Sequence, residues 1–447
     1  MENSSALQDE LKHIVGESGI LPEAQIAAYM FDGHVPQAVV LPASVQEIQE
    51  VLQFASKQDL SVMPAGAGTK LGIGNLPQKV DIVLATTRLN SVVEYEPADL
   101  TVTVEAGIRL AALQAVLAQH RQYLALDPPY TDRCTLGGIV ATNASGSLRL
   151  RHGAARNQVL GLQVVHANGT VVKSGGKVVK NVAGYDLNKL YIGAFGTLGI
   201  ITEVTLKLSP IPAHEAILVA DFQNVQGGID TGLSIIGSQI LPMFVNLSIN
   251  SDFVGTATDN ATDAKRPTLV VGFGGDPETV AWQLTECRGI MEQNRALGVT
   301  STEGESRARL QKAIREFPAT DTDTKSIVIA KLNLKRTGIA EFAAQVMDVS
   351  WARDVQVMAL LGSGILYLSM PVTSDTDFEG LANTLTQLRQ SATEARGNLI
   401  VEAAPPEIKQ HIDVWGAVGD TLGLMKQVKN RFDAGSLLNP GRFVSGI

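Results

Sequence analysis

Cysteine is scarce in this sequence of 447 residues, which contains only Cys134 and Cys287. Two cysteines cannot form a disulfide framework, a thiolate cluster or a cysteine-rich metal site. The chain also lacks an apolar run near the 18 residues that a membrane span requires. Its acidic start, MENSSALQDELKHIVG, has no apolar core of a signal peptide. We therefore expect a cytoplasmic protein without an iron–sulfur centre of its own, whose contact with the inner face of a membrane, where it occurs, depends on partners.

Positive charge and histidine clusters are missing as well. The 36 basic and 45 acidic residues give a formal charge of -9, and no basic run is present, which argues against a nucleic-acid partner. The seven histidines are isolated, with no H-x-x-H pattern, at positions 13, 34, 120, 152, 166, 214 and 411. We expect no metal site.

Hydrophobic periodicity predicts alternating helices and strands, and the length favours two or three domains. Ser44 with Glu47 predicts a capped helix over PASVQEIQEVLQFASKQ. Asn168–Gly169 between two β-rich runs predicts a hairpin, and IITEVTLKL reads as an alternating strand. From about Pro210 onward, residues to about 405 alternate strands and helices, which predicts an α+β domain on an antiparallel sheet.

The segment MPAGAGTKLGIGN, residues 63–75, has the composition of a phosphate-binding loop. Glycines allow successive backbone N–H groups to point at one anion. It is not a Walker A motif, because neither Ser nor Thr follows Lys70, and it lacks the third glycine of a dinucleotide fingerprint. A plain glycine-rich turn after a strand remains the alternative.

Two later segments are also rich in glycine. The first, DPPYTDRCTLGGIVATNASGSLRLRHG, covers residues 127–153 and combines Gly137–Gly138 with hydrogen-bonding Thr and Asn side chains. The second is KVVKNVAGYDLNKLYIGAFGTLGIITEV, residues 177–204. In it, Asp186 is predicted to cap a helix whose inward face is Leu187, Leu190 and Tyr191.

These three segments, in this order and spacing, resemble the flavin-binding domain of the vanillyl-alcohol oxidase / p-cresol methylhydroxylase superfamily. The runs VVKNVAGYDLNKL, GTLGIIT and the terminal FDAGSLLNPGRF resemble in particular the glycolate oxidase FAD-binding subunits of the GlcE type. The resemblance is strong over residues 30–210, good over 400–447 and weak between them.

The resemblance implies an FAD-binding domain of two α+β subdomains over residues 1–210. It also implies a cap domain over 211–405, with an antiparallel sheet flanked by helices, and a segment 406–447 that returns to the flavin domain. The diphosphate of FAD would lie on the loop Pro64, Ala65, Gly66, Ala67, Gly68, Thr69, Lys70 and Leu71. Further expected cofactor contacts are Pro128, Thr135, Leu136, Gly137, Gly138, Thr142, Asn143, Gly153, Ile200, Ile201 and Asn439. Because the first loop has neither histidine nor cysteine, we expect non-covalent FAD.

Catalytic residues are harder to assign, since the H-G-D-G-N-x-H motif of related hydroxy-acid dehydrogenases is absent. A 2-hydroxy acid needs a cation for its carboxylate. Lys331 in VIAKLNLK is a candidate, and the alternative is a solvated charged face of Lys331, Asn333 and Lys335. Glu402 in LIVEAAP is a candidate base, and His152 is a candidate neighbour of the flavin.

The resemblance therefore favours an FAD-binding subunit of a glycolate, or D-2-hydroxy acid, dehydrogenase complex. Such a subunit passes electrons through FAD to an iron–sulfur partner of the GlcF type, beside a GlcD-like flavoprotein. The alternatives are a stand-alone FAD-dependent dehydrogenase or oxidase of another hydroxy substrate, and a non-catalytic assembly subunit.

Overall fold

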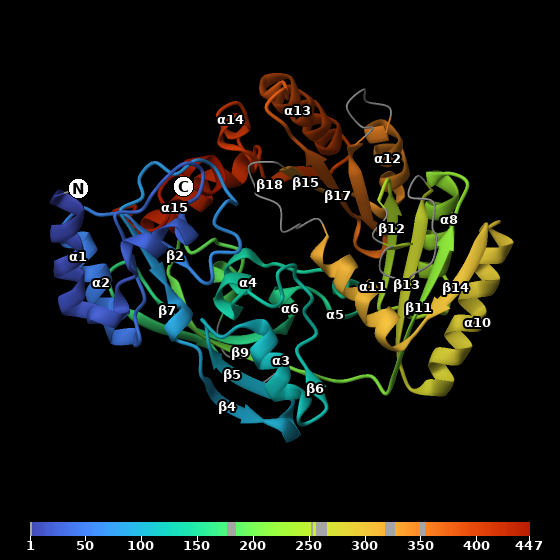
Figure 1. The fold of residues 1–447 in the computed structure, drawn as a ribbon, viewed down its shortest axis with the longest axis horizontal. Helices are drawn as coiled ribbons and strands as arrows, with labels where there is room; N and C mark the ends of the chain where they lie inside the picture. The colour runs from blue at the N-terminus through green and yellow to red at the C-terminus, as the bar shows by residue number, and fades with distance from the viewer. Residues whose placement is uncertain (1, 177–184, 252–253, 256–265, 318–326, 348–353) are drawn as a thin grey trace.

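The computed structural model describes residues 2–176, 185–251, 254–255, 266–317, 327–347 and 354–447. Figure 1 shows two smaller sheets on the N-terminal side, one large sheet on the opposite side, and the C-terminal helix beside the N-terminal region. Among the described residues, no helix has both the length and the apolar character needed to cross a membrane.

The first sheet is parallel and has three strands in the order β1-β3-β2. Its elements are β1 (Ala38–Val40), β2 (Val62–Ala65) and β3 (Ile82–Ala85), with helices α1 (Glu2–Val15) and α2 (Val45–Lys57) packed beside them. The α2 cap is confirmed, because Ser44 Oγ accepts the Glu47 N–H at 3.1 Å. The Glu47 carboxylate accepts the N–H of Ala43, which anchors the residue before the cap.

The second sheet is antiparallel, in the order β4-β5-β9-β7-β8. Its strands are β4 (Val92–Glu96), β5 (Thr101–Glu105), β7 (Val159–Val165), β8 (Val171–Gly175) and β9 (Ile200–Lys207). Its helices are α3 (Leu110–Ala118), α4 (Leu136–Thr142), α5 (Arg149–His152), α6 (Ala155–Gln158) and α7 (Asn188–Tyr191), and β6 (Gln122–Tyr123) pairs with β10 (Ser209–Pro210). The predicted hairpin is confirmed, because β7 and β8 pair around a turn in which Gly169 has a φ of 81°.

The described residues of the cap region form one antiparallel sheet of eight strands, in the order β14-β11-β13-β12-β16-β17-β15-β18. The strands are β11 (His214–Asp221), β12 (Phe244–Ile249), β13 (Thr268–Gly275), β14 (Gly298–Thr302), β15 (Ile327–Asn333), β16 (Gln356–Leu360), β17 (Ile365–Pro371) and β18 (Asn398–Ala403). The strand-like runs in the sequence did not include the edge strands β14 (GVTST) and β18 (NLIVEA).

Helices cover the two faces of this sheet unequally. One face packs against α8 (Val225–Ile236), α10 (Pro277–Gln293), α12 (Ile339–Met347) and α13 (Phe378–Glu394). The alternate side chains of the strands, including Ile217, Ile329 and Met358, meet α11 (Gly304–Glu316) and Leu148 of the second sheet region. The second face is thus turned toward the glycine-rich segments (Figure 1).

The C-terminal segment returns to the first sheet through α14 (Pro406–Lys409) and α15 (Leu422–Phe432). The Val62 N–H donates to the Leu437 carbonyl at 2.8 Å, so residues after α15 extend the edge of β2. Buried Lys429 donates to the Thr197 carbonyl and to Asp433. This buried lysine fastens α15 to the turn before β9.

The third glycine-rich segment departs from expectation. Residues 177–184, which carry most of the VVKNVAGYDL run, lie outside the described residues. The predicted Asp186 cap is wrong: α7 starts at Asn188, follows Leu187 without a side-chain cap, and Asp186 pairs with Lys189 instead. Of its expected inward face only Tyr191 is buried, because a helix of four residues is too short to present a continuous apolar stripe.

Candidate functional site

A cavity opens where the end of β2, the first turn of α4 and the start of β9 converge. The expected loop Pro64–Leu71 contributes all eight of its residues to the wall. Other expected residues on this wall are Pro128, Thr135, Gly137, Gly138, Thr142, Ile200, Ile201 and Asn439. Segments more than 300 positions apart in the sequence therefore enclose one volume.

Three expected cofactor residues lie elsewhere. Leu136 points into the core of the second sheet region and is fully buried there. Asn143 borders a second cavity, and its Oδ1 accepts the Arg156 N–H at 3.2 Å. Gly153 borders neither cavity; it has a φ of 81° and packs against Asn157. Sequence neighbours of lining residues can face away, because side-chain direction alternates with backbone conformation.

Backbone packing at this cavity demands glycine. A Cβ on Gly66 would lie 1.9 Å from Thr135 Oγ1, and one on Gly137 would lie 2.8 Å from the Ala106 Cβ. The loop and α4 therefore approach one another more closely than any side chain allows. Three polar atoms of the described residues at this wall, Thr135 Oγ1, Asn439 Oδ1 and Arg442 Nη1, are buried without a hydrogen-bond partner. Buried polar atoms normally have a hydrogen-bond partner. This wall therefore fits a ligand, or water, that supplies the missing partners.

The charge of the cavity wall is positive. Lys70 and Arg442 line it, and no carboxylate is among its lining residues. Cys134 is also on the wall, and its thiol donates to the Thr131 carbonyl at 3.8 Å. Burial raises the pKa of Cys134 to about 12, so it stays a thiol. An anionic, partly flat ligand such as a flavin dinucleotide fits a glycine-lined wall of this charge.

Sequence reasoning missed several lining residues, notably Arg442, Phe195 and Cys134. Arg442 could have been predicted from the sequence, because it follows Asn439 in the NPGRF run that carried part of the resemblance. Phe195 carried no local signal: its ring packs against Trp415 and Phe443, which belong to the distant C-terminal segment.

A second cavity adjoins the first and shares six lining residues with it: Lys70, Ile73, Pro129, Thr142, Ala144 and Phe195. Its opposite wall is the inner face of the cap sheet. Met358, Tyr367, Lys331 and Ile400 occupy paired positions on β16, β17, β15 and β18, and all four border the cavity. Directly paired residues project from one face of a sheet, so this row forms a continuous floor.

Glu402 reaches this floor through a bulge. Ala330 pairs with Val401 but Ile329 pairs with Ala403, which leaves Glu402 as the extra residue of β18. Bulges re-aim side chains and are common beside active sites. The Glu402 carboxylate lies 3.3 Å from Lys331 Nζ, and the two side chains are 23% and 17% exposed. The interpretation of Lys331 as part of a solvated charged face is therefore wrong.

The ionisation of this pair follows from its surroundings. Burial alone would raise the pKa of Glu402, but Lys331 and then Lys70 outweigh it and the pKa is lowered. Burial alone would lower the pKa of Lys331, but Tyr367 and Glu402 outweigh it and the pKa is raised. Burial lowers the pKa of Lys70. The floor thus carries an ionised Lys331–Glu402 pair, with Lys331 also 5.6 Å from the centre of the Tyr367 ring.

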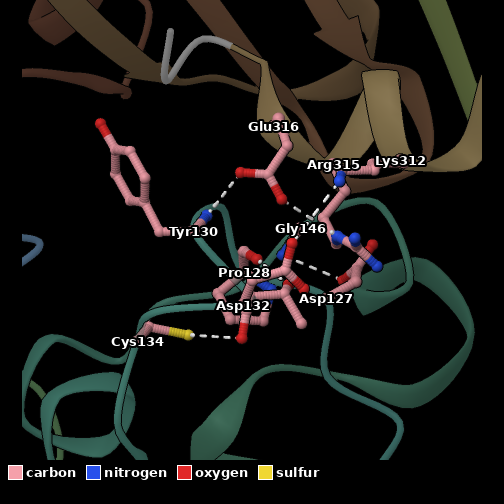
Figure 2. Close-up of polar contacts among 10 residues, drawn as sticks. Asp127, Pro128, Tyr130, Asp132, Cys134, Gly146, Lys312, Arg315 and Glu316 are labelled. Atoms are coloured by element: carbon pink, nitrogen blue, oxygen red, sulfur yellow. Dashed lines mark hydrogen bonds and ion pairs between the residues drawn. The ribbon is translucent and has the colours of Figure 1, made fainter. Parts of the chain in front are cut away.

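The rim of the second cavity joins α11 to the segment 127–134 (Figure 2). Glu316 accepts the Tyr130 N–H at 2.6 Å, and Lys312 lies 3.5 Å from Asp132. Arg315, between them in sequence, borders the cavity, and its Nε is 3.3 Å from Glu316. These contacts hold the end of α11, and with it the Arg315 guanidinium, against the glycine-rich region.

Asp127 fixes the other side of this rim. Its carboxylate accepts the N–H groups of Gly146 and Leu148 at 3.1 and 2.9 Å. Burial is the largest influence and raises the pKa of Asp127 to about 7, against the opposing effect of these two hydrogen bonds. Gly146 itself borders the second cavity, so this buried carboxylate shapes the wall without facing it.

His152, a candidate flavin neighbour, is located away from both cavities. Its Nε2 lies 3.2 Å from the Tyr123 hydroxyl, and burial followed by Arg151 lowers its pKa. This position, under the cap sheet, offers no contact with the cavities. Among the described residues, no three His, Cys, Asp or Glu side chains gather as a metal site would require. The absence of a metal stays a prediction.

Comparisons with known proteins identify the two regions that enclose these cavities. Residues 36–175 match an FAD binding domain, and residues 211–350 match the C-terminal domain of FAD linked oxidases. The chain is 27% identical to glycolate oxidase subunit GlcD of Bacillus subtilis over 420 residues, which cover 91% of this chain and 89% of the relative. It is 28% identical to D-2-hydroxyglutarate dehydrogenase of Xanthomonas citri pv. viticola over 420 residues, with 91% and 89% covered. The structure of p-cresol methylhydroxylase with substrate bound superimposes with a TM-score of 0.75 at 15% identity, covering 99% of this chain and 97% of that one.

Two expectations are confirmed by these matches. The chain has the α+β fold of the p-cresol methylhydroxylase type, and FAD is its cofactor. The glycolate oxidase relative is subunit GlcD, whereas the sequence motifs suggested the GlcE type. The assignment to GlcE therefore stays a prediction.

Proposed function

We propose that this FAD-dependent oxidoreductase, which has the p-cresol methylhydroxylase-type fold, oxidises a small D-2-hydroxy acid such as glycolate within a dehydrogenase complex. One observation carries the proposal: a cavity floored by a partly buried Lys331–Glu402 pair opens directly onto the glycine-lined cavity. Two of the curated relatives carry names that point to hydroxy-acid substrates, glycolate and D-2-hydroxyglutarate.

The charge of the second cavity favours an anionic substrate. Lys70, Arg315 and Lys331 border it against one carboxylate, Glu402. In our proposal Lys331 binds the substrate carboxylate, and Arg315 adds to the positive field from the rim. A lysine in a low-dielectric cavity binds a carboxylate more strongly than one in water does.

Glu402 is proposed as the base. Oxidation of a 2-hydroxy acid removes a hydride equivalent from carbon 2 and a proton from the hydroxyl, leaving a 2-oxo acid. Bound FAD supplies the two-electron acceptor, and Glu402 takes the proton. Its lowered pKa makes Glu402 a weak base in the substrate-free protein. A substrate carboxylate that pairs with Lys331 would compete with Glu402 for the cation, raising the Glu402 pKa when the base is needed.

The residues that hold FAD are proposed from the wall of the first cavity. Backbone N–H groups of Gly66–Lys70 take the diphosphate, and Thr135 and Asn439, whose buried oxygens lack partners, take polar groups of the cofactor. We propose that the flavin is attached non-covalently, since no histidine is among the described residues of the wall and the cysteine there, Cys134, is held as a thiol. Residues 1–210 and 406–447 form the flavin domain in this proposal, and 211–405 form the cap.

Electrons must leave the flavin after each turnover. With only two cysteines, Cys134 and Cys287, both buried, this chain offers no iron–sulfur ligand set of its own. We propose a GlcF-like iron–sulfur subunit as the acceptor and a GlcD-like flavoprotein as a sister subunit, with this chain of the GlcE type.

Anaerobic reduction tests the proposal. The purified yellow protein, alone, is mixed with glycolate or D-lactate, and the loss of flavin absorbance is followed. We expect bleaching by at least one substrate, strong slowing by Glu402→Gln, and flavin released into the supernatant by acid. Bleaching that requires the sister flavoprotein would move the chemistry off this chain. Flavin that stays with acid-precipitated protein would contradict the non-covalent bond.

A further inference from the structure

A buried cluster of Asp32, Lys409 and Arg442 lies behind the glycine loop. Lys409 Nζ is 2.7 Å from Asp32 Oδ1, and Arg442 Nη1 is 3.6 Å from Asp32 Oδ2. The three side chains are 4%, 1% and 7% exposed in that order. They come from three distant segments: the start of the flavin domain, α14 at the exit from the cap, and the last residues of the chain.

The two cations of the cluster donate hydrogen bonds to backbone carbonyl groups of the glycine loop and the residues that follow it. Arg442 Nη2 donates to the carbonyls of Leu71 and Ile73, and Lys409 Nζ donates to the carbonyl of Gly72. Three carbonyls that follow the glycine turn are thereby paired with the two cations of the cluster. The preceding loop residues 66–70 line the first cavity.

The charges of the cluster do not balance. Asp32 is the one carboxylate that the described residues bring within ion-pair distance of either cation, so two positive charges share one negative charge. Burial lowers the pKa of Lys409 to about 8 and that of Arg442 to about 10, although Asp32 raises both. A buried net positive charge is costly unless an anion compensates it.

Arg442 Nη1 lies 3.6 Å from Asp32 Oδ2, and both atoms are buried without a hydrogen-bond partner among the described residues. Since Nη1 carries two N–H groups, one can face Asp32 and the other can meet such an anion. Arg442 borders the first cavity. Its guanidinium is stacked 4.7 Å from the centre of the Phe31 ring, which fixes its plane. Within the described parts of the chain no carboxylate lines this cavity, so these lining residues do not supply the compensating negative charge.

We propose that Arg442 is a cofactor-binding residue that donates from Nη1 to a diphosphate oxygen of FAD, with Asp32 and Lys409 as positioning residues. The diphosphate carries the negative charge of the oxidised cofactor, and the loop that Arg442 contacts lines the same cavity. The two contributions act together: the guanidinium neutralises the anion, and the loop geometry that it fixes presents the backbone donors.

Ligand titrations of the apoprotein test this without any substrate. Arg442→Gln, Arg442→Lys and the exposed control Arg431→Gln are each titrated with FAD, ADP and riboflavin, and folding is checked by circular dichroism and thermal unfolding. A charge-assisted hydrogen bond contributes about 1.5–3 kcal/mol, so Arg442→Gln should weaken FAD and ADP binding about 10- to 100-fold. Riboflavin, which has no phosphate, should bind as it does to the unmodified protein.

The conservative variant separates charge from architecture. Arg442→Lys keeps the positive charge but loses the fork to two carbonyls, and it should retain most of the ADP affinity. A parallel loss of riboflavin affinity in Arg442→Gln would assign a purely structural role and overturn the proposal. So would ADP affinity equal to that of the Arg431→Gln control, or equal losses in the Lys and Gln variants. None of these outcomes bears on hydroxy-acid oxidation.

Discussion

Replacing Lys331 with methionine should weaken both the fold and substrate binding. Lys331 Nζ and the Glu402 carboxylate are 3.3 Å apart. At an effective dielectric constant of 20, two unit charges at that distance attract by about 5 kcal/mol. Desolvation of both groups offsets much of this attraction. Because both side chains keep partial contact with solvent, we expect Lys331→Met to lower the free energy of unfolding by about 2–3 kcal/mol.

The pH dependence of this contribution follows from the direction of both shifts. The pKa of Glu402 is lowered from 4.5, so its share of the stability is present above about 4.5 and is lost as the pH falls through the lowered value. The pKa of Lys331 is raised from 10.5, so its share is present below about 10.5 and is lost as the pH rises through the raised value. The difference between the unmodified protein and Lys331→Met should therefore be constant across neutral pH and shrink in acid.

Urea unfolding at pH 7, followed by circular dichroism on flavin-free protein, measures the effect. The set comprises Lys331→Met, Glu402→Met, the double variant and Lys335→Met, an exposed control four positions away. The losses in unfolding free energy of the two single variants, added together, should exceed the loss of the double variant by about 1–3 kcal/mol. The reason is that each single change leaves one charge unpaired. Additivity within about 0.5 kcal/mol would refute the buried-pair reasoning. In the holoprotein, KM for the hydroxy acid should rise strongly in Lys331→Met and stay unchanged in Lys335→Met.

Three further outcomes are expected. Gly66→Ala should lose most bound flavin, because its Cβ would overlap a threonine hydroxyl at 1.9 Å, whereas Gly72→Ala, with open space around its Cβ, should retain it; equal flavin content in the two would contradict the close approach. Lys429→Met should lower the free energy of unfolding by about 3 kcal/mol by stranding a buried carboxylate, and exposed Lys426→Met should not; denaturant unfolding distinguishes them. Since the pKa of Asp127 is raised from 3.8 to about 7, its contribution to stability is full below about 3.8 and declines as the pH rises toward 7. Unfolding measured across that range should show a smaller decline in Asp127→Asn, and an unchanged profile would argue against burial of the ionisable form.

Local sequence predicted the parts of the fold that local interactions determine. The Ser44 cap, the Asn168–Gly169 hairpin and the alternating strand β9 each depend on residues within a few positions of one another. The α7 cap failed because the four-residue helix is set by its neighbours and not by its own pattern. The edge strands β14 and β18 escaped notice because an edge strand is held by one partner whose identity the local pattern does not reveal.

The candidate site divides in the same way. The glycine segments indicated a phosphate-bearing ligand, since only glycine permits such close backbone contact. Most of the residues expected from them line one cavity. The composition also excludes a cysteine-based cluster, and it argues against a nucleic-acid partner, which stays a prediction.

Tertiary structure decided which charges meet. Glu402 lies beside Lys331 because strand pairing and one bulge bring β18 next to β15, and Arg442 lies beside Asp32 because the chain returns to its beginning. His152 is close to a glycine segment in sequence, but in the structure its side chain contacts Tyr123 beneath the cap sheet. Pairing across tens or hundreds of residues depends on the register of whole sheets and on the burial that results. Composition determined the kind of ligand, and the packing of distant strands determined the charges that face it.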